Sequence, residues 1–377
     1  MQKMVLIPTL ACLLMPWLAA SAQSPSGKTY TVSSGNSIQK TLDKIQPGDK
    51  VQVYVGTYHE TLIIHTDNVT LVGLSFEGER PVLNGIKEVE SLERAVIIAA
   101  DGVTVEGFVI QNYSEYGVIA DNVKNLTLRD LIIRKTGAFG VLVDDIEGFT
   151  MQRVVTSEAT AAAAYVLESV NLFIKDSEFL LSPYGLVVAD CVQGSIENSG
   201  FNSNAVGLLV SSTPDAPKQE GDFLRLRHCR VLNNEGDSTP GYMGEISLPT
   251  QVPGGVGIAI VGADHTEVSD SIIAGNGACG VATYARPESD PPETDEVQES
   301  FPGVPDHTYF HQNTYADNGT ASSEAFKKAF PGVEPCDIYW DGTGLRNQYQ
   351  ENKDLKTHPE NLVVEQGGVH SDVMHFI

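Results

Sequence analysis

Carboxylate residues recur at one place in a repeated segment of this 377-residue chain. Asp121, Asp144 and Glu168 each end a short segment that begins with a small residue and then alternates apolar positions. If these segments are strands stacked about 4.8 Å apart, the three side chains form a column of carboxylates on one outer face. Like charges at that spacing repel unless they are protonated or share a cation. Because Ca²⁺ prefers oxygen ligands, the pattern predicts a calcium site at these residues.

Polar residues border this column. Asn122, Asp145 and Ser169 follow the three carboxylates directly, and Asp190 lies one repeat further on. We expect these four residues to contribute a substrate-binding surface beside the cation. A second interpretation stays open, because Asp and Asn are also favoured at strand-to-turn corners for local hydrogen bonding.

The repeat decides how these residues are positioned. Segments of the same type start at Gly117, Gly140, Ala164, Gly185, Gly207, Gly257 and Gly280, and the first steps are 21 to 24 residues. A second strand pattern and a short third apolar stretch follow each segment, with Gly, Asn and Asp at the corners. One coil cannot bury its apolar residues alone, so coils must stack. The sequence therefore predicts an all-β fold, a right-handed parallel β-helix with three strands per coil of about 22 residues.

The same pattern predicts which side chains form the core. Within the repeated segments, the residues expected to point inward are Val118 and Ala120, Val141 and Val143, Tyr165 and Leu167, and Leu186 and Val188. An antiparallel sandwich is the rival fold. It would need two-residue hairpin turns, which are largely missing.

The two ends of the chain carry signs of caps. Asn36 and Ser37 predict the start of a short helix whose Ile38, Leu42 and Ile45 share one face, and Val51 to Tyr58 alternates as a strand. Ser322 to Phe330 predicts another helix. The expected organisation is a signal peptide at 1–22, an N-terminal cap and first strand at 23–60, the parallel β-helix at 61–320, and an irregular C-terminal cap or tail at 321–377.

Four short motifs near the N-terminus resemble a known family: Gly35-Asn-Ser-Ile-Gln39, Gln46-Pro-Gly-Asp49, Gly56-Thr-Tyr58 and Asn68-Val-Thr-Leu71. With the repeat, they make residues 28–320 similar to parallel β-helix repeat proteins of the pectin-lyase-like superfamily, especially exported bacterial members. That superfamily includes pectate lyases, polygalacturonases and alginate epimerases, and also non-catalytic periplasmic accessory proteins. The resemblance is specific for the fold and weak for activity.

The resemblance implies two functions. The first is binding or processing of acidic polysaccharide with Ca²⁺ held by carboxylates; if catalytic, the protein would be a polysaccharide lyase or uronan epimerase. Tyr284 and Arg286, at the start of the last of three insertions (212–222, 235–255 and 286–306), are the candidate catalytic residues. The alternative is a non-catalytic periplasmic accessory or interaction scaffold for an exported redox or metal enzyme. No complete catalytic signature of the superfamily is present, and Arg129 and Lys175 on another face are expected to be solvated charges.

Composition limits the partners. The chain carries 49 acidic and 24 basic residues, a formal net charge of −25. Such a charge disfavours nucleic acid and anionic membranes as partners. An acidic polysaccharide would need a local basic patch or bound cations.

The first residues predict export. Lys3, the apolar stretch from Met4 to Leu18 and Ala20-Ser21-Ala22 form a secretory signal peptide with cleavage near Ala22, so we expect a periplasmic or secreted protein. No apolar run reaches the roughly 20 residues of a membrane span. Neither haem nor a nucleotide cofactor is expected. Four cysteines would remain after cleavage, and the sequence leaves their disulfide pairing open: Cys191, Cys229, Cys279 and Cys336.

Overall fold

The computed structural model describes residues 27–87, 90–212, 223–236, 252–286, 303–352, 354–360 and 362. The predicted signal peptide and most of the three insertions lie outside these residues. Within the described part of the chain, no helix is both long and apolar enough to cross a membrane.

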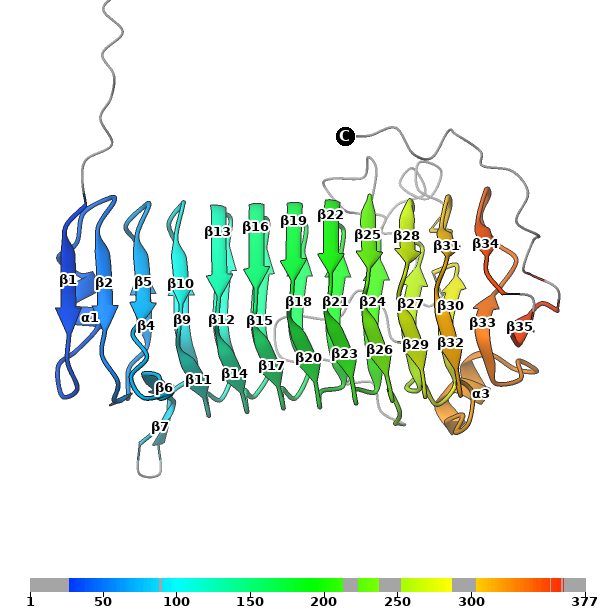
Figure 1. Cartoon of the computed structure of the whole chain (residues 1–377), viewed down its shortest axis with the longest axis horizontal. Coiled ribbons are helices and arrows are strands. Elements are labelled where there is room, and N and C mark those ends of the chain that lie inside the picture. The colour runs from blue at the N-terminus through cyan, green and yellow to red at the C-terminus, as the bar shows by residue number, and fades with distance from the viewer. Residues whose placement is uncertain are drawn as a thin grey trace, which may run out of the picture.

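The described chain winds into one elongated solenoid, with its coils side by side from the N-terminal to the C-terminal end (Figure 1). Each regular coil gives one strand to each of three sheets, and neighbouring coils pair in parallel. One continuous apolar core runs through the centre, from Val32 to Leu362. The parallel β-helix predicted from the repeat is confirmed.

The first sheet contains twelve strands in the described residues. In order they are β1 (Thr29–Val32), β2 (Lys50–Val53), β5 (Thr70–Gly73), β10 (Thr104–Glu106), β13 (Lys124–Arg129), β16 (Glu147–Gln152), β19 (Val170–Lys175), β22 (Val192–Glu197), β25 (Leu224–Arg227), β28 (Thr266–Ser269), β31 (Tyr309–His311) and β34 (Gln348–Gln350).

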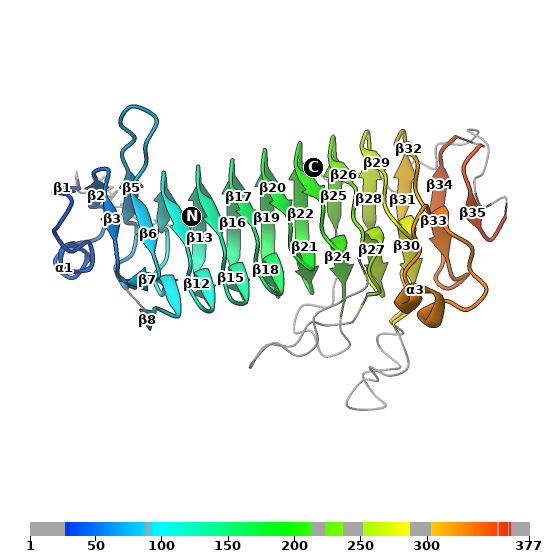
Figure 2. The same cartoon turned by 90° about the horizontal axis from the view of Figure 1, so that it is seen from below.

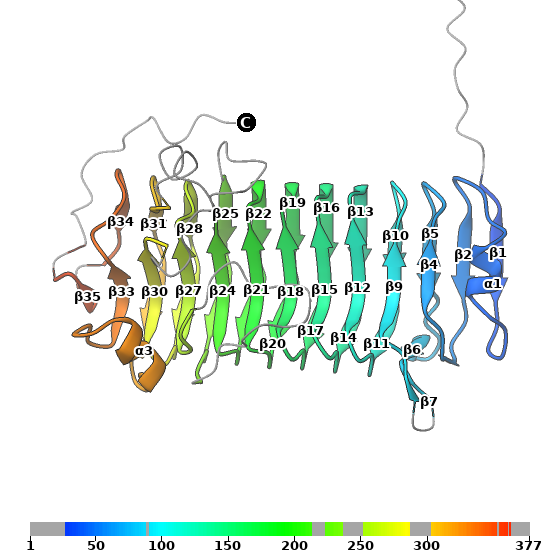
Figure 3. The same cartoon turned by 180° about the vertical axis from the view of Figure 1, so that it is seen from behind.

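The second and third sheets complete each coil. The second sheet consists of β3 (Thr57–Tyr58), β6 (Val82–Asn84), β11 (Val109–Gln111), β14 (Ile132–Arg134), β17 (Val155–Ser157), β20 (Glu178–Leu180), β23 (Gly200–Asn202), β26 (Arg230–Leu232), β29 (Ile272–Ala274) and β32 (Thr314–Ala316). The third sheet, labelled across the view from behind (Figure 3), consists of β4 (Leu62–Ile64), β9 (Arg94–Ile98), β12 (Tyr116–Asp121), β15 (Phe139–Asp144), β18 (Ala162–Leu167), β21 (Tyr184–Ala189), β24 (Val206–Ser211), β27 (Val256–Val261), β30 (Cys279–Tyr284), β33 (Cys336–Trp340) and β35 (Thr357–His358). A small hairpin, β7 (Ile86–Lys87) and β8 (Glu90–Ser91), lies outside these sheets.

The register corrects the predicted repeat by one residue in one coil. Val141 pairs with Ala164 and Val143 with Val166, so Ala163 rather than Ala164 lies opposite Gly140. Tyr165 and Leu167 therefore do not belong to the inward set, and the prediction that they did was wrong. The cause is the run of four alanines from 161 to 164, in which no side chain marks the strand start. Tyr165 instead joins a second apolar cluster, formed by outward-facing residues of the third sheet.

Corners between the third and first sheets use a left-handed residue. Asn122, Asp145, Glu168 and Asp190 stand at equivalent places with φ between 47° and 55°. Asn and Asp tolerate this conformation because their short polar side chains can hydrogen-bond locally. Corner geometry thus accounts for part of the Asp and Asn pattern that the sequence displays.

Buried amide side chains stack along the corner between the second and third sheets. Asn276 shows the pattern: its Oδ1 accepts from Asn234 Nδ2 at 2.8 Å, and its Nδ2 donates to Asn318 Oδ1 at 2.9 Å. Its Nδ2 also donates to the Val231 carbonyl at 3.2 Å. Asn234, Asn276 and Asn318 are at most 2% exposed, so each amide depends on its neighbours for hydrogen bonds.

A short helix covers the N-terminal coil, as predicted. This helix, α1 (Gln39–Leu42), lies at the N-terminal end of the solenoid (Figure 2). Within it and its flanks, Ile38, Leu42 and Ile45 are buried against the core. The carboxylate of Glu60 accepts hydrogen bonds from the backbone N–H groups of Ile38 and Gln39, at 3.0 and 3.1 Å. The single strand predicted from Val51 to Tyr58 was wrong, because a turn divides it into β2 and β3 of different sheets.

The C-terminal helix is also present. In α3 (Glu324–Ala329), Ser323 caps the helix by accepting from the Phe326 N–H, and Phe326 packs into the outer cluster of the third sheet. The strands β33, β34 and β35 lie beyond residue 320 and belong to the sheets, so the segment predicted as an irregular tail contains regular coil structure.

We expect Asn276→Ala to lower the free energy of unfolding by about 3 kcal/mol, because it removes the buried hydrogen bonds that the Asn276 side chain makes with Asn234 and Asn318. Urea denaturation followed by circular dichroism would measure the change. Asn36→Ala is the matched control: Asn36 is exposed, and its side chain makes no hydrogen bond within the described chain, so the change should stay within about 0.5 kcal/mol. Equal effects of the two substitutions would contradict a supporting role for the amide stack.

Candidate functional site

Two of the three predicted calcium ligands stack directly. Asp121 at the end of β12 pairs in register with Asp144 at the end of β15. Leu167 takes the next place, and Glu168 falls one residue later, at the left-handed corner. The column of three equivalent carboxylates was therefore wrong in its third member, as a consequence of the one-residue slip in the alanine run.

Asp144 is nevertheless in an unfavourable electrostatic environment. Its Oδ1 is buried and has no hydrogen-bond partner within the described chain. Burial, together with the charges of Glu168 and Asp121, raises the pKa of Asp144 to about 6. Glu168 thus acts on Asp144 electrostatically although it does not share its column.

The carboxylates do not by themselves complete a metal site. Across the described residues, no group of three or more His, Cys, Asp or Glu side chains is arranged to hold a metal ion. The donor set at Asp144 is chemically suitable for Ca²⁺, since it consists of carboxylate oxygens, but further ligands would have to come from elsewhere.

The four predicted substrate-binding residues divide into two pairs. Asn122 and Asp145 are exposed at the corner. Asp190 is 3% exposed and Ser169 is fully buried, where its hydroxyl accepts from the Ile146 N–H and donates to the Leu167 carbonyl. Only the first pair is placed where a ligand could touch it.

The candidate catalytic residues lie at the same corner, further along the axis. Tyr284 is 4% exposed and packs edge-on against Phe330, and burial raises the pKa of its hydroxyl well above 10. Its phenol therefore stays neutral at ordinary pH and is poorly suited to act as a base. Arg286 donates to the Ser212 carbonyl at 3.4 Å, which joins the starts of the first and third insertions.

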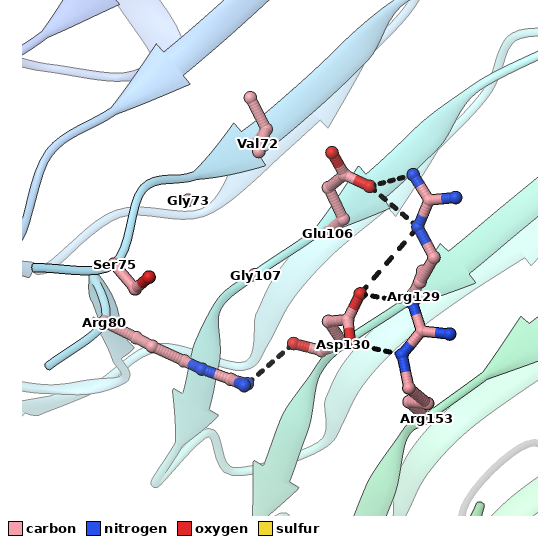
Figure 4. A pocket seen from close by; sticks show the side chains of 9 residues that line it. All are labelled: Val72, Gly73, Ser75, Arg80, Glu106, Gly107, Arg129, Asp130 and Arg153. Atoms are coloured by element: carbon pink, nitrogen blue, oxygen red, sulfur yellow. Dashed lines mark hydrogen bonds and ion pairs between the residues drawn. The ribbon is translucent and has the colours of Figure 1, made fainter. Parts of the chain in front are cut away.

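An arginine-rich hollow lies on the opposite edge of the first sheet, at the corner that leads to the second sheet (Figure 4). It encloses about 370 Å³. The ends of β5, β10 and β13 form its floor, and Arg80 reaches in from the segment before β6. We call this the arginine pocket; its lining is Val72, Gly73, Ser75, Arg80, Glu106, Gly107, Arg129, Asp130 and Arg153.

Two carboxylates orient two of the three guanidinium groups of this pocket. Arg129 pairs with Glu106, and Arg153 binds Asp130 through both oxygens, at 2.7 and 2.8 Å. This hydrogen bonding by Arg153 is the main cause of the lowered pKa of Asp130. Each pair joins residues of adjacent coils, so it fixes the side chains of one coil against the next.

Arg80 carries the surplus positive charge. Its Nη1 donates to the backbone carbonyl of Asp130 at 2.8 Å (Figure 4). Its guanidinium forms no ion pair within the described chain, although its charge contributes to the lowered pKa of Asp130. Three cations and two anions in one hollow leave a net positive charge. The pocket is therefore locally positive in a chain whose formal net charge is −25.

The repeat pattern in the sequence did not predict this pocket. Arg129 was expected to be a solvated charge, and the structure instead places it in an ion pair at the pocket wall. The spacing of 23 residues from Glu106 to Arg129, and from Asp130 to Arg153, could have revealed stacked pairs. Arg80 comes from an irregular connection between β5 and β6, which the repeat does not place.

Comparisons with known proteins agree on the fold. The family described as "Right handed beta helix region" matches residues 94–287, which is more than half of the chain. This chain belongs to that family. No curated protein matches the chain.

Solved structures with a similar shape include two polysaccharide lyases and a tailspike depolymerase. An alginate lyase from Paenibacillus sp. str. FPU-7 has 11% identity and a TM-score of 0.43, covering 78% of this chain and 99% of its own. Pectate lyase Pel9A has 10% identity and a TM-score of 0.42, with 81% and 85% covered. The tailspike protein gp49 of Acinetobacter baumannii bacteriophage Fri1, a capsular polysaccharide depolymerase, has 10% identity and a TM-score of 0.40, with 82% and 67% covered. At such low identity, these similarities concern the fold alone.

We expect Asp144→Asn to stabilise the protein at about pH 7.5 and to leave it nearly unchanged at about pH 4. Because the folded-state pKa of Asp144 is raised, its ionisation costs stability as the pH rises from about 4 through 6, and Asn does not ionise. The gain should be about 1 kcal/mol once solvent screening of this half-buried group is considered. Urea denaturation in chelator at both pH values measures it.

The control for this pH effect is Asp317→Asn, which changes an exposed left-handed aspartate. Its stability difference from the parent protein should not vary between the two pH values. A gain in Asp144→Asn that is equally large at low pH would contradict the electrostatic explanation.

Proposed function

We propose that this protein binds an acidic polysaccharide, and that the arginine pocket holds a carboxylate group of the sugar chain. The observation that carries this proposal is Arg80, a guanidinium without a carboxylate partner in the described chain, fixed beside two further arginines. A planar guanidinium matches a carboxylate with two parallel hydrogen bonds.

The pocket is open where an anion would enter. Gly73 and Gly107 lie against each other on its floor, and a Cβ on either residue would collide with the backbone of the other. With no side chains there, the hollow stays accessible beneath the arginines. Ser75 is exposed at its rim and supplies a hydroxyl that can donate to a ligand oxygen.

An extended ligand suits the site better than a small anion. Arg129 is in register with Gln152, and Gln152 with Lys175, so a row of polar side chains leads from the pocket along the solenoid axis. Such a row spaces its members by about 4.8 Å and can contact successive parts of a polymer. The overall negative charge of the protein repels polyanions generally, which makes binding depend on this local patch.

Calcium is a separate part of the proposal. Asp121, Asp144 and Glu168 would hold the ion on the other edge of the first sheet, with a uronate carboxylate of the substrate supplying further oxygen ligands. Ca²⁺ would there neutralise charge that otherwise opposes binding of an acidic chain. The unpartnered Asp144 Oδ1 and the raised pKa of Asp144 support this part. Export to the periplasm or outside the cell, which the N-terminal segment predicts, would bring the protein to such substrates.

We expect Arg80→Gln to weaken binding of polygalacturonate or alginate oligosaccharides about tenfold at low salt, because it removes one charge-assisted contact. Isothermal titration calorimetry of the full chain, with a neutral dextran oligosaccharide alongside, measures affinity and selectivity. Ultraviolet detection of unsaturated products in the same samples reports lyase activity.

Arg134→Gln provides the matched control. Arg134 is exposed, contacts Gln111 and lies outside the pocket, so the same loss of charge should change the affinity less than twofold. Equal losses in the two variants would indicate non-specific charge attraction. If no acidic oligosaccharide binds the parent protein, the proposed function is wrong and the scaffold alternative takes its place.

We expect Ca²⁺ titrated into chelator-treated protein to bind more tightly when an acidic oligosaccharide is present, and Asp144→Asn to abolish that gain. Calorimetry with and without the oligosaccharide tests this, with Asp317→Asn as the control. Absence of saturable binding in both conditions would remove calcium from the proposal and leave the arginine pocket untouched, because the two sites lie at different corners of the coil.

A further inference from the structure

Cys279 and Cys336 are direct neighbours on two adjacent strands. Cys279 opens β30, Cys336 opens β33, and the two residues pair in register in the third sheet. Both side chains are buried, at 0% and 2% exposure, in the outer apolar cluster that also contains Phe326 and Tyr339. The neighbouring Cys279 thiol, together with burial, raises the pKa of Cys336.

The geometry of the pair falls within the range of a disulfide. In-register residues on neighbouring parallel strands lie about 4.8 Å apart, and disulfide-bonded residues have Cα separations of about 4.4–6.8 Å. Equivalent positions on parallel strands also point their Cβ atoms to the same side. Bond formation therefore requires a side-chain rotation and no rearrangement of the coil.

The other two cysteines are placed differently. Cys191 follows β21 of the third sheet and donates to the Ala189 carbonyl at 3.3 Å. Cys229 follows β25 of the first sheet and donates to the Arg227 carbonyl at 3.4 Å. These positions belong to different corners of the coil. Each thiol thus donates to the carbonyl of the residue two positions earlier in the chain. The Ser177 hydroxyl makes the same kind of hydrogen bond in the coil of β19.

We propose that Cys279 and Cys336 form a disulfide bond that ties the C-terminal coil to the body of the solenoid, and that Cys191 and Cys229 remain thiols. The two thiols lose two protons and two electrons as the S–S bond forms. The oxidant is a disulfide of a thiol–disulfide exchange partner, which accepts the two electrons and is released as two thiols. Exchange takes place while the C-terminal coil is still docking, before the pair becomes buried.

The bond would act as a covalent end cap. β33 is followed in the third sheet by the two-residue strand β35, so few strand hydrogen bonds hold this end of the sheet. A link to β30 closes a long loop of chain, which restricts the unfolded ensemble of the cap. Enclosure in the apolar cluster would then shield the disulfide from reductants.

Peptide mapping by mass spectrometry tests the pairing. The full-length mature protein is refolded from denaturant in oxidised and reduced glutathione, then denatured, alkylated without reductant and digested. We expect one cross-linked species joining the peptides of Cys279 and Cys336, two hydrogens lighter than the pair of thiol peptides, with Cys191 and Cys229 alkylated. Alkylation of all four cysteines, or any other pairing, would overturn the proposal.

Thermal unfolding supplies an independent readout. Parent protein that is reduced while unfolded and refolded with reductant present should have a Tm about 5 °C below that of the cross-linked protein, and Cys279→Ser should show no such sensitivity to reductant. Cys191→Ser is the matched control, and it should keep the sensitivity. A parent protein whose Tm does not respond to reductant after complete cross-linking would contradict the stabilising role, and the mapping result stands even if a variant fails to fold.

Discussion

The strict register between coils is the constraint on which the rest of this structure depends. Backbone hydrogen bonds pair each strand residue with the residue at the equivalent position one coil later. Side chains at equivalent positions therefore lie next to one another along the axis. In the interior, this stacks amide on amide, as Asn276 on Asn234 shows. On the surface, the register places charged side chains of adjacent coils next to one another, so their signs decide whether they attract or repel.

The two edges of the first sheet carry opposite arrangements of neighbouring charges. At the corner with the second sheet, acids meet bases: Glu106 pairs with Arg129 and Asp130 with Arg153, and Arg80 adds an uncompensated charge. At the corner with the third sheet, Asp121 meets Asp144, and the result is a carboxylate that resists ionisation. One repeating backbone thus produces one edge with surplus positive charge and another with neighbouring carboxylates, and the proposed binding of an acidic polysaccharide rests on this contrast.

The sequence was sufficient for the fold because small residues, alternating apolar positions and polar corners recur at a nearly fixed interval. It failed in the alanine run at 161–164, where four identical side chains carry no register information, and Glu168 was therefore assigned to the wrong column. It also failed for the arginine pocket, because Arg80 arrives from an irregular connection. The sequence also did not predict which polar side chains are buried. Ser169 and Tyr284 were expected to reach a ligand, yet neighbouring parts of the chain bury both.

The direction of the hydrogen bonds between coils determines how the solenoid responds to tension. Because the bonds between coils run along the long axis, the coil interfaces are arranged in series, and each bears the whole of a tension applied along that axis. The interface with the fewest bonds therefore opens first. Resistance to pulling would then be set by the terminal coils, where α1 covers one end and β35 closes the other (Figure 1).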